Sequence, residues 1–91
     1  MVELKDTINL MQSKNYKDRF VAEYLQLKTR AEKLQRFCVE IKAKNWVGEE
    51  EPKHDCPLEL LEAQLRAMHE YLHALELRAV IEKIDLLNHP I

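Results

Sequence analysis

The sequence contains two heptad repeats, which constrain the fold more than any other feature. Apolar residues recur at alternating intervals of four and three between residues 20 and 41, and the alternation returns between residues 58 and 79. This spacing places side chains on one stripe of an α-helix, where they pack against another helix. The first stripe comprises Phe20, Tyr24, Leu27, Ala31, Leu34, Cys38 and Ile41, and the second comprises Leu58, Leu61, Leu65, Met68, Leu72, Leu75 and Ala79.

The first long helix is predicted over residues 15–45. Ser13 or Asn15 can cap its start, because either side chain can accept a hydrogen bond from an N–H of the first turn. Residues 1–14 precede it, and we expect them to form an arm or short helix that packs on a neighbouring subunit.

The second long helix is predicted over residues 57–87. Pro57 suits the first turn, where a missing N–H costs nothing, and Asp55 or Cys56 can cap it. The stretch NHP at residues 88–90 is a stop signal, so the helix is expected to end just before it.

The acidic segment 46–56 joins the two helices and contains Gly48, the single glycine of the chain. The predicted fold is therefore all-α: one 91-residue domain, 1–91, built as a long antiparallel two-helix hairpin. Trp46 is interpreted as a lid on the end of the hairpin, with an exposed binding anchor as the alternative.

A hairpin of two helices buries only one stripe on each helix, so its core is small. This chain has further apolar residues beside both stripes, and we expect them to drive association into a homo-oligomeric helical bundle. These residues are Val21, Leu25, Phe37, Val39, Leu60, Leu77, Val80, Ile81 and Ile84.

Several classes of protein are disfavoured by composition. No apolar run approaches 18 residues and the first residues lack an apolar signal sequence, so neither a membrane partner nor secretion is expected. Cys38 and Cys56 fit no C-x-x-C pattern. A cytoplasmic protein with two reduced thiols is the plain interpretation.

Residues 69–73 read HEYLH, which matches the H-E-x-x-H motif of zinc peptidases. The heptad register places His69 and His73 on the flank and outer face of the second helix. A catalytic zinc needs a third protein ligand and a cleft that excludes water, and the sequence offers neither. We interpret the motif as a solvated helix face, and expect no metal, no cofactor and no enzymatic activity. A zinc enzyme is the alternative, and it predicts stoichiometric zinc and activity lost on His69→Ala.

Charge is spread unevenly along the chain, whose net charge is −2. Residues 16–45 carry eight Lys and Arg against four acids, whereas residues 57–87 carry three bases against six acids. Either the two halves pair with each other, or the first helix keeps a basic face for an anionic ligand. We do not expect long nucleic acid as a partner, because a chain with a pI near 6.1 would bring its acids close to the phosphate backbone.

Aromatic and basic residues alternate along the first helix and recur on the second. Arginine can neutralise phosphate and tyrosine can stack on a base, so this pattern is typical of a site for a small anionic nucleotide. The alternative is that the tyrosines border the core and the cations pair with acids. The candidate ligand-binding residues are Tyr16, Arg19, Tyr24, Arg30, Tyr71 and Arg78.

Two blocks of the chain, YKDRFVAEYLQLKTRAEKL (16–34) and CPLELLEAQLRAMHEYLHALELRAVIEKIDL (56–86), resemble a family of small phage and prophage proteins related to a protein of crAss-like phages. The resemblance to that family implies no catalytic activity for this chain. The residues that match this phage and prophage family include Tyr16, Arg19, Glu23, Tyr24, Leu27, Arg30 and Leu34, and then Cys56, Pro57, Leu60, Leu61, Gln64, Leu65, Met68, Tyr71, Leu75, Arg78 and Glu82. In size and hairpin design, and not in shared motifs, the chain is also similar to phage sponge proteins, which are small helical oligomers.

The resemblance to sponge proteins implies an anti-defence function. Such a protein would sequester a nucleotide immune signal, such as a cyclic dinucleotide or an ADP-ribose derivative, at subunit interfaces. The alternative is a helical protein–protein interaction module that binds and inhibits a host protein through a flanking apolar stripe and the acidic turn.

Overall fold

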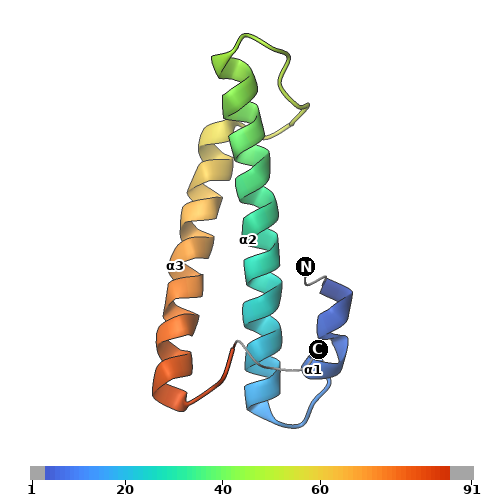
Figure 1. Cartoon of the computed structure of the whole chain (residues 1–91), viewed down its shortest axis with the longest axis vertical. Coiled ribbons are helices and arrows are strands. Elements are labelled where there is room, and N and C mark those ends of the chain that lie inside the picture. The colour runs from blue at the N-terminus through green and yellow to red at the C-terminus, as the bar shows by residue number, and fades with distance from the viewer. Residues whose placement is uncertain (1–3, 87–91) are drawn as a thin grey trace.

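The computed structural model describes residues 4–86. The 3-10 helix η1 (Leu4–Thr7) leads into a short helix, α1 (Ile8–Met11), and two long helices follow: α2 (Tyr16–Trp46) and α3 (Leu58–Glu82). Helices α2 and α3 lie antiparallel, and the N-terminal helices pack on the other side of α2 (Figure 1). The prediction of an all-α fold with two long helices and a short N-terminal helix is confirmed.

The start of α2 is fixed by a small hydrogen-bonded turn. The Asn15 side chain accepts a hydrogen bond from the backbone N–H of Lys17 at 2.9 Å, which makes Asn15 the cap. The Ser13 hydroxyl donates to the Asp18 carboxylate at 2.6 Å and accepts from the Asn15 N–H at 3.1 Å. Both predicted cap residues are therefore used, with Ser13 holding the turn around the Asn15 cap.

The start of α3 differs from the prediction. Pro57 occupies the N-cap position, and no side chain caps the helix there. The Pro57 carbonyl accepts hydrogen bonds from the N–H groups of Leu60 and Leu61 at 3.1 and 3.2 Å. Asp55 and Cys56 are thus wrong as predicted caps, because the fixed φ of proline already directs the chain into the helix.

The end of α3 also differs, since the helix stops at Glu82 and not at residue 87. Lys83 adopts a left-handed conformation, with φ 58° and ψ 48°. The N–H of Ile84 then donates to the carbonyl of Ala79 at 2.8 Å, which closes a Schellman motif. This turn carries Ile84 back into the core, where it is 7% exposed. The predicted stop signal at 88–90 lies outside the described residues.

The two predicted stripes form the contact between α2 and α3. Every one of their fourteen side chains is buried or half-buried. The continuous core lies at the end of the hairpin where α2 begins and α3 ends, and it includes a residue of α1 and one that follows α3. The core residues are Leu10, Phe20, Val21, Ala22, Tyr24, Leu75, Ala79 and Ile84.

The N-terminal helices cover α2 of their own chain. Val21 and Ala22, on the face of α2 opposite α3, are 0% and 1% exposed, and Leu10 packs in the same core. The Gln26 amide donates to the Thr7 hydroxyl at 2.8 Å, which ties η1 to α2. The N-terminal segment is thus a short helix, one of the two expected forms, and it packs on α2 of its own chain. Its packing on a neighbouring subunit stays a prediction.

The segment that follows α2 does not form the predicted lid. Trp46 is the last residue of α2, and its side chain is 91% exposed. Gly48 then takes φ +74°, a left-handed conformation suited to glycine, and the N–H of Glu49 donates to the Lys44 carbonyl at 2.9 Å. The chain therefore turns away from the helix end, leaving Trp46 in the alternative, exposed position.

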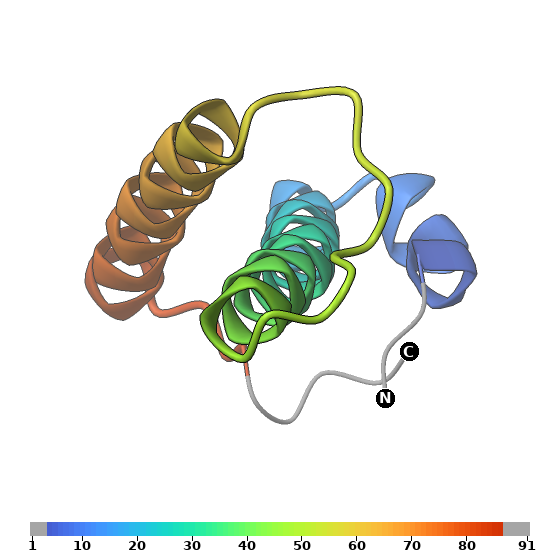
Figure 2. The same cartoon turned by 90° about the horizontal axis from the view of Figure 1, so that it is seen from above.

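Within residues 4–86, no helix combines the length and the apolar character needed to cross a membrane. Viewed from above, α2 lies between α3 and the N-terminal helices (Figure 2). No described element covers the outer face of α3.

Candidate ligand-binding face

Five of the six predicted ligand-binding residues lie on one side of the hairpin. At 100° per residue, Tyr16, Arg19 and Arg30 fall within an arc of about 60° on α2, and Tyr71 and Arg78 fall within about 20° on α3. Contacts between Arg78 and α2 place the two groups on the same side of the α2–α3 contact. We call this surface the arginine face, defined by Tyr16, Arg19, Arg30, Tyr71 and Arg78.

Arg78 is the most firmly held residue of the arginine face. Its Nε donates to Glu82 Oε2 at 2.8 Å, and its guanidinium carbon lies 4.8 Å from the centre of the Phe20 ring. The hydrogen bond to Glu82 raises the pKa of Arg78, and the charges of Glu23 and Tyr16 act in the same direction. The same hydrogen bond lowers the pKa of the Glu82 carboxyl, to which Tyr16 also donates. An incoming anion would have to compete with Glu82 for this guanidinium.

The other members of the arginine face are less constrained. Arg19 Nη1 donates to the Ser13 carbonyl at 2.7 Å, so Arg19 also ties the start of α2 to the preceding turn. Arg30 is exposed and forms no ion pair with any residue in the described range 4–86. Tyr71 is 46% exposed. Arg30 and Tyr71 can therefore meet a ligand without breaking a hydrogen bond or ion pair to any residue in the range 4–86.

Tyr24, the sixth predicted residue, lies on the opposite side of the α2–α3 contact. It is 8% exposed, and its hydroxyl donates to Glu76 at 2.9 Å. Burial, followed by the hydrogen bond and the charge of Glu76, raises the pKa of Tyr24 to about 12. In this structure Tyr24 is a core residue with a satisfied hydroxyl, separate from the other five.

A hollow beside Tyr24 escapes the sequence prediction altogether. It is lined by Tyr24, Glu76 and Val80 of the two helices, and by Ile84 and Asp85 after the α3 turn. No sequence pattern predicts this hollow, because Lys83 is an unusual residue for the left-handed position that folds this segment back. Its lining contains two carboxylates and no cation, so its charge is wrong for a phosphate.

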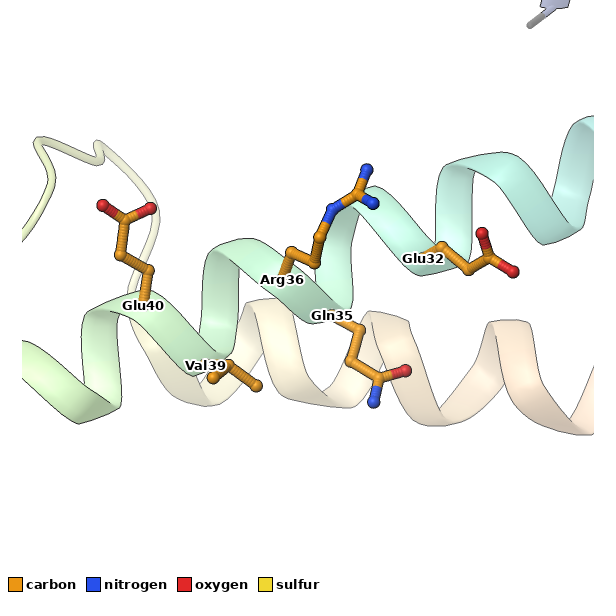
Figure 3. Close-up of a pocket in the computed structure, with 5 residues that line it drawn as sticks. All are labelled: Glu32, Gln35, Arg36, Val39 and Glu40. Carbon is orange, nitrogen blue, oxygen red and sulfur yellow. The ribbon is translucent and has the colours of Figure 1, made fainter. Parts of the chain in front are cut away.

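A second hollow lies along α2 alone (Figure 3). Arg36 and Glu40 project from one side of the helix, whereas Gln35 and Val39 project from the other. With Glu32, these five residues line a volume of about 440 Å³. All five come from three turns of one helix and include two carboxylates, so this is a shallow acidic surface rather than a cleft between elements.

The zinc-type motif lies where the heptad register predicts. His69, Glu70 and His73 are all exposed on α3. Within the part of the chain that the structure describes, no group of three His, Cys, Asp or Glu side chains is placed to hold a metal.

The two cysteines are structurally distinct. Cys38 is buried in the α2 stripe, as predicted, and burial raises the pKa of its thiol, with the charge of Glu62 adding to the effect. Cys56 is half-buried, and its carbonyl contacts His54 Nδ1 at 2.7 Å. The other ring nitrogen of His54 lies 3.0 Å from Glu51, so His54 organises the connecting segment.

Ion pairing between the two halves is sparse. Among residues 4–86, Lys42–Glu62 is the one ion pair that joins α2 to α3. The prediction that the halves neutralise each other thus holds at a single position. Basic residues of α2 that form no ion pair with a described residue include Lys28, Arg30, Lys33 and Arg36.

Comparison with known proteins identifies the family. No curated protein and no solved structure matches the chain. The family model described as Sequestin matches residues 14–81, which include the cap of α2, the connecting segment and all but the last residue of α3. The match covers three quarters of the 91 residues and both helices that carry the arginine face. The chain therefore belongs to the Sequestin family.

Proposed function

We propose that this protein is a phage-encoded sponge that binds a small anionic nucleotide on the arginine face and withholds it without altering it. The ligand would be an immune signal such as a cyclic dinucleotide or an ADP-ribose derivative. The observation that carries the proposal is the gathering of three arginines and two tyrosines on one side of the hairpin. The family name, which denotes sequestration, supports the same function.

The chemistry of the arginine face suits a phosphorylated ligand with an aromatic base. Guanidinium groups bind phosphate oxygens through paired, charge-assisted hydrogen bonds. Tyr71 presents a half-exposed ring for stacking, which is worth about 1–3 kcal/mol per base in nucleic-acid complexes. Arg19 and Arg30 are eleven residues apart, or about 16 Å along α2, so one ligand with separated phosphates can reach both.

Binding without catalysis is part of the proposal. The arginine face contains no cysteine or histidine, and its one carboxylate neighbour on α3, Glu82, is held by Arg78. A general base must reach the reacting proton, and a nucleophile must be activated by a neighbour. The residues of the face bind and orient, which is all that a sponge requires.

Retention of an intact nucleotide is the direct test. The protein is incubated with a panel of cyclic di- and trinucleotides and ADP-ribose derivatives, then removed by filtration, and the nucleotide left in solution is measured. Heating releases the bound fraction for identification. A nucleotide that is depleted and returns unchanged is the expected result. A nucleotide that returns altered would make the protein an enzyme, and no retention of any compound would end the proposal.

A matched pair of variants assigns the face. Arg30 and Arg36 are both exposed on α2, have no ion pair with a described residue, and point about 120° apart. Arg30→Gln should reduce nucleotide retention at least tenfold with helicity unchanged by circular dichroism, whereas Arg36→Gln should retain the nucleotide as wild type does. Equal retention by both variants would remove Arg30 from the site. Arg19→Ala should also abolish binding, but it additionally removes the contact with Ser13.

A second candidate function is favoured by Trp46. Its 91% exposed side chain stands beside Val47, 66% exposed, at the start of the acidic segment. Exposed tryptophan is a common anchor in protein–protein contacts, so this end of the hairpin could bind and inhibit a host protein. In that case a purified host partner would raise the melting temperature of the protein, whereas nucleotides would leave it unchanged. Trp46→Ala would abolish the rise that the partner causes.

A further inference from the structure

Helix α3 carries a second heptad stripe on the face that points away from α2. Its positions alternate in steps of three and four from residue 60 to residue 81, over about 32 Å of helix. Its centre lies about 160° around the helix from the stripe that contacts α2. We call it the outer stripe, and it comprises Leu60, Ala63, Ala67, Glu70, Ala74, Leu77 and Ile81.

The chain itself leaves the outer stripe open. Leu60, Leu77 and Ile81 are 59%, 53% and 77% exposed. Among the described elements α3 contacts only α2, and both views place α3 at the edge of the molecule (Figures 1 and 2). A regular apolar stripe in this position marks an interaction surface that a helix of matching length can cover.

We infer that the outer stripe pairs antiparallel with the outer stripe of a second copy of this chain, around a two-fold axis that passes between residues 70 and 71. A two-fold contact is formed by the same surface on both subunits, so the stripe must be complementary to itself. Around this axis Ile81 lies opposite the partner's Leu60, and Ala74 lies opposite the partner's Ala67. Alanines therefore meet on either side of the axis and large aliphatic residues meet at the ends. That gradient fits two crossing helices, which approach most closely at the centre and diverge outward.

One charged residue of the stripe falls beside the axis. Glu70 lies about 1.5 Å along the helix from the position opposite the partner's Glu70, and about 3 Å from the position opposite the partner's His73. Two facing carboxylates oppose the contact, whereas an imidazole is a suitable neighbour for a carboxylate, so the two His73 side chains are the partners that this register supplies to the two Glu70 side chains.

The exposed area of the chain is consistent with a missing partner. A folded monomer of 10.8 kDa is expected to expose about 5,500 Å². This chain exposes 6711 Å² with its terminal residues included. The difference, roughly 1,200 Å², contains the area of the terminal residues and of an elongated shape, and it leaves room for the about 800 Å² that each partner covers in a standard complex.

The pairing completes the arginine face. Tyr71 lies between the outer stripe and α2, so the two-fold axis brings the Tyr71 rings of both copies side by side, with an Arg78 about 10 Å away on either side. One nucleotide bound there is contacted by tyrosine from both chains, and two chains bind one ligand. This assignment rests on the proposed function, whereas the helix pairing does not.

Two neighbouring residues provide a matched test of the pairing. Ile81 and Val80 are both aliphatic and are 77% and 80% exposed, but only Ile81 belongs to the outer stripe. The mass of each protein is measured without nucleotide by light scattering coupled to size exclusion. Wild type and Val80→Glu should be dimers or multiples of dimers, whereas Ile81→Glu should have half their mass. Circular dichroism verifies that both variants are folded. A monomeric wild type, or an Ile81→Glu variant with the mass of wild type, would overturn the pairing.

A cysteine pair tests the register independently. In a Cys38→Ala, Cys56→Ser background, Ala67→Cys combined with Ala74→Cys should form a covalent dimer on oxidation. Ala67→Cys combined with Val80→Cys should form far less. Equal cross-linking of both pairs would overturn the antiparallel register.

Nucleotide retention then separates the two proposals. Ile81→Glu should lose retention at least tenfold, whereas Val80→Glu should keep it, with one ligand per two chains. An Ile81→Glu monomer that retains nucleotide as wild type does would overturn the shared site while the sponge function stands. A dimeric wild type that retains no nucleotide would remove the sponge function and leave the helix pairing intact.

Discussion

Tyr24 lies at the α2–α3 contact with its hydroxyl hydrogen-bonded to Glu76 at 2.9 Å, and its ionisation is coupled to folding. Burial and Glu76 raise its pKa from 10.0 to about 12 in the folded chain. Between these values the unfolded chain loses this proton and the folded chain keeps it, so stability must fall as pH rises from about 10 to about 12. Urea unfolding over this range should show a shallower decline for Tyr24→Phe than for wild type. Parallel declines would mean that Tyr24 titrates alike in both states.

At the scale of elements, the end of α3 is unusual because Lys83 adopts a left-handed conformation. A residue with a Cβ pays about 1–2 kcal/mol in this conformation, and glycine does not. Lys83→Gly should therefore raise the free energy of unfolding by about 1 kcal/mol, measured by urea denaturation. Lys83→Ala removes the same charge but keeps the Cβ, so it should leave stability near wild type. A gain of equal size in both variants would show that charge, and not conformation, limits the helix end.

The two long helices were predictable because every residue of both heptad stripes lies buried or half-buried in the contact between them. The helix ends were less predictable, since each end depends on the conformation of one or two residues, which different residue types can adopt. Asn15 and Ser13 were both recognised as candidates at the start of α2. The early end of α3 was missed, because Lys83 lacks the glycine signal that marks the same turn at Gly48.

The arginine face was also predictable only in part. Helical periodicity places Arg19 and Arg30 on one side of α2, and Tyr71 and Arg78 on one side of α3, so these pairs follow from sequence. Tyr24 also follows from sequence, but as a member of the heptad stripe: its buried position argues against ligand contact and for a role in the core. The covering of α2 by the N-terminal helices was not predictable, because a short apolar segment can pack within its own chain or on another.

On the scale of the whole molecule, packing is uneven along a shape that measures 50 × 25 × 21 Å. The continuous core joins α1, α2, α3 and the segment after α3 at one end of the hairpin. Three residues of the arginine face, Tyr16, Arg19 and Arg78, lie beside that end. The core therefore supports the proposed site, and a loss of packing there should also loosen the residues that bind a ligand.

Leu10 tests whether the N-terminal helices belong to this cooperative core. Its side chain is 7% exposed, whereas Ile8, two residues earlier in α1, is 49% exposed. Because truncation of a buried leucine removes apolar contacts and leaves a cavity, Leu10→Ala should cost about 2 kcal/mol or more. For a domain of this size that lowers the melting temperature by at least about 8 °C. Ile8→Ala should cost about 0.5 kcal/mol, as expected of a surface position. Thermal unfolding by circular dichroism measures both. Equal, small effects would mean that α1 unfolds independently of α2, and the core would then consist of the two long helices alone.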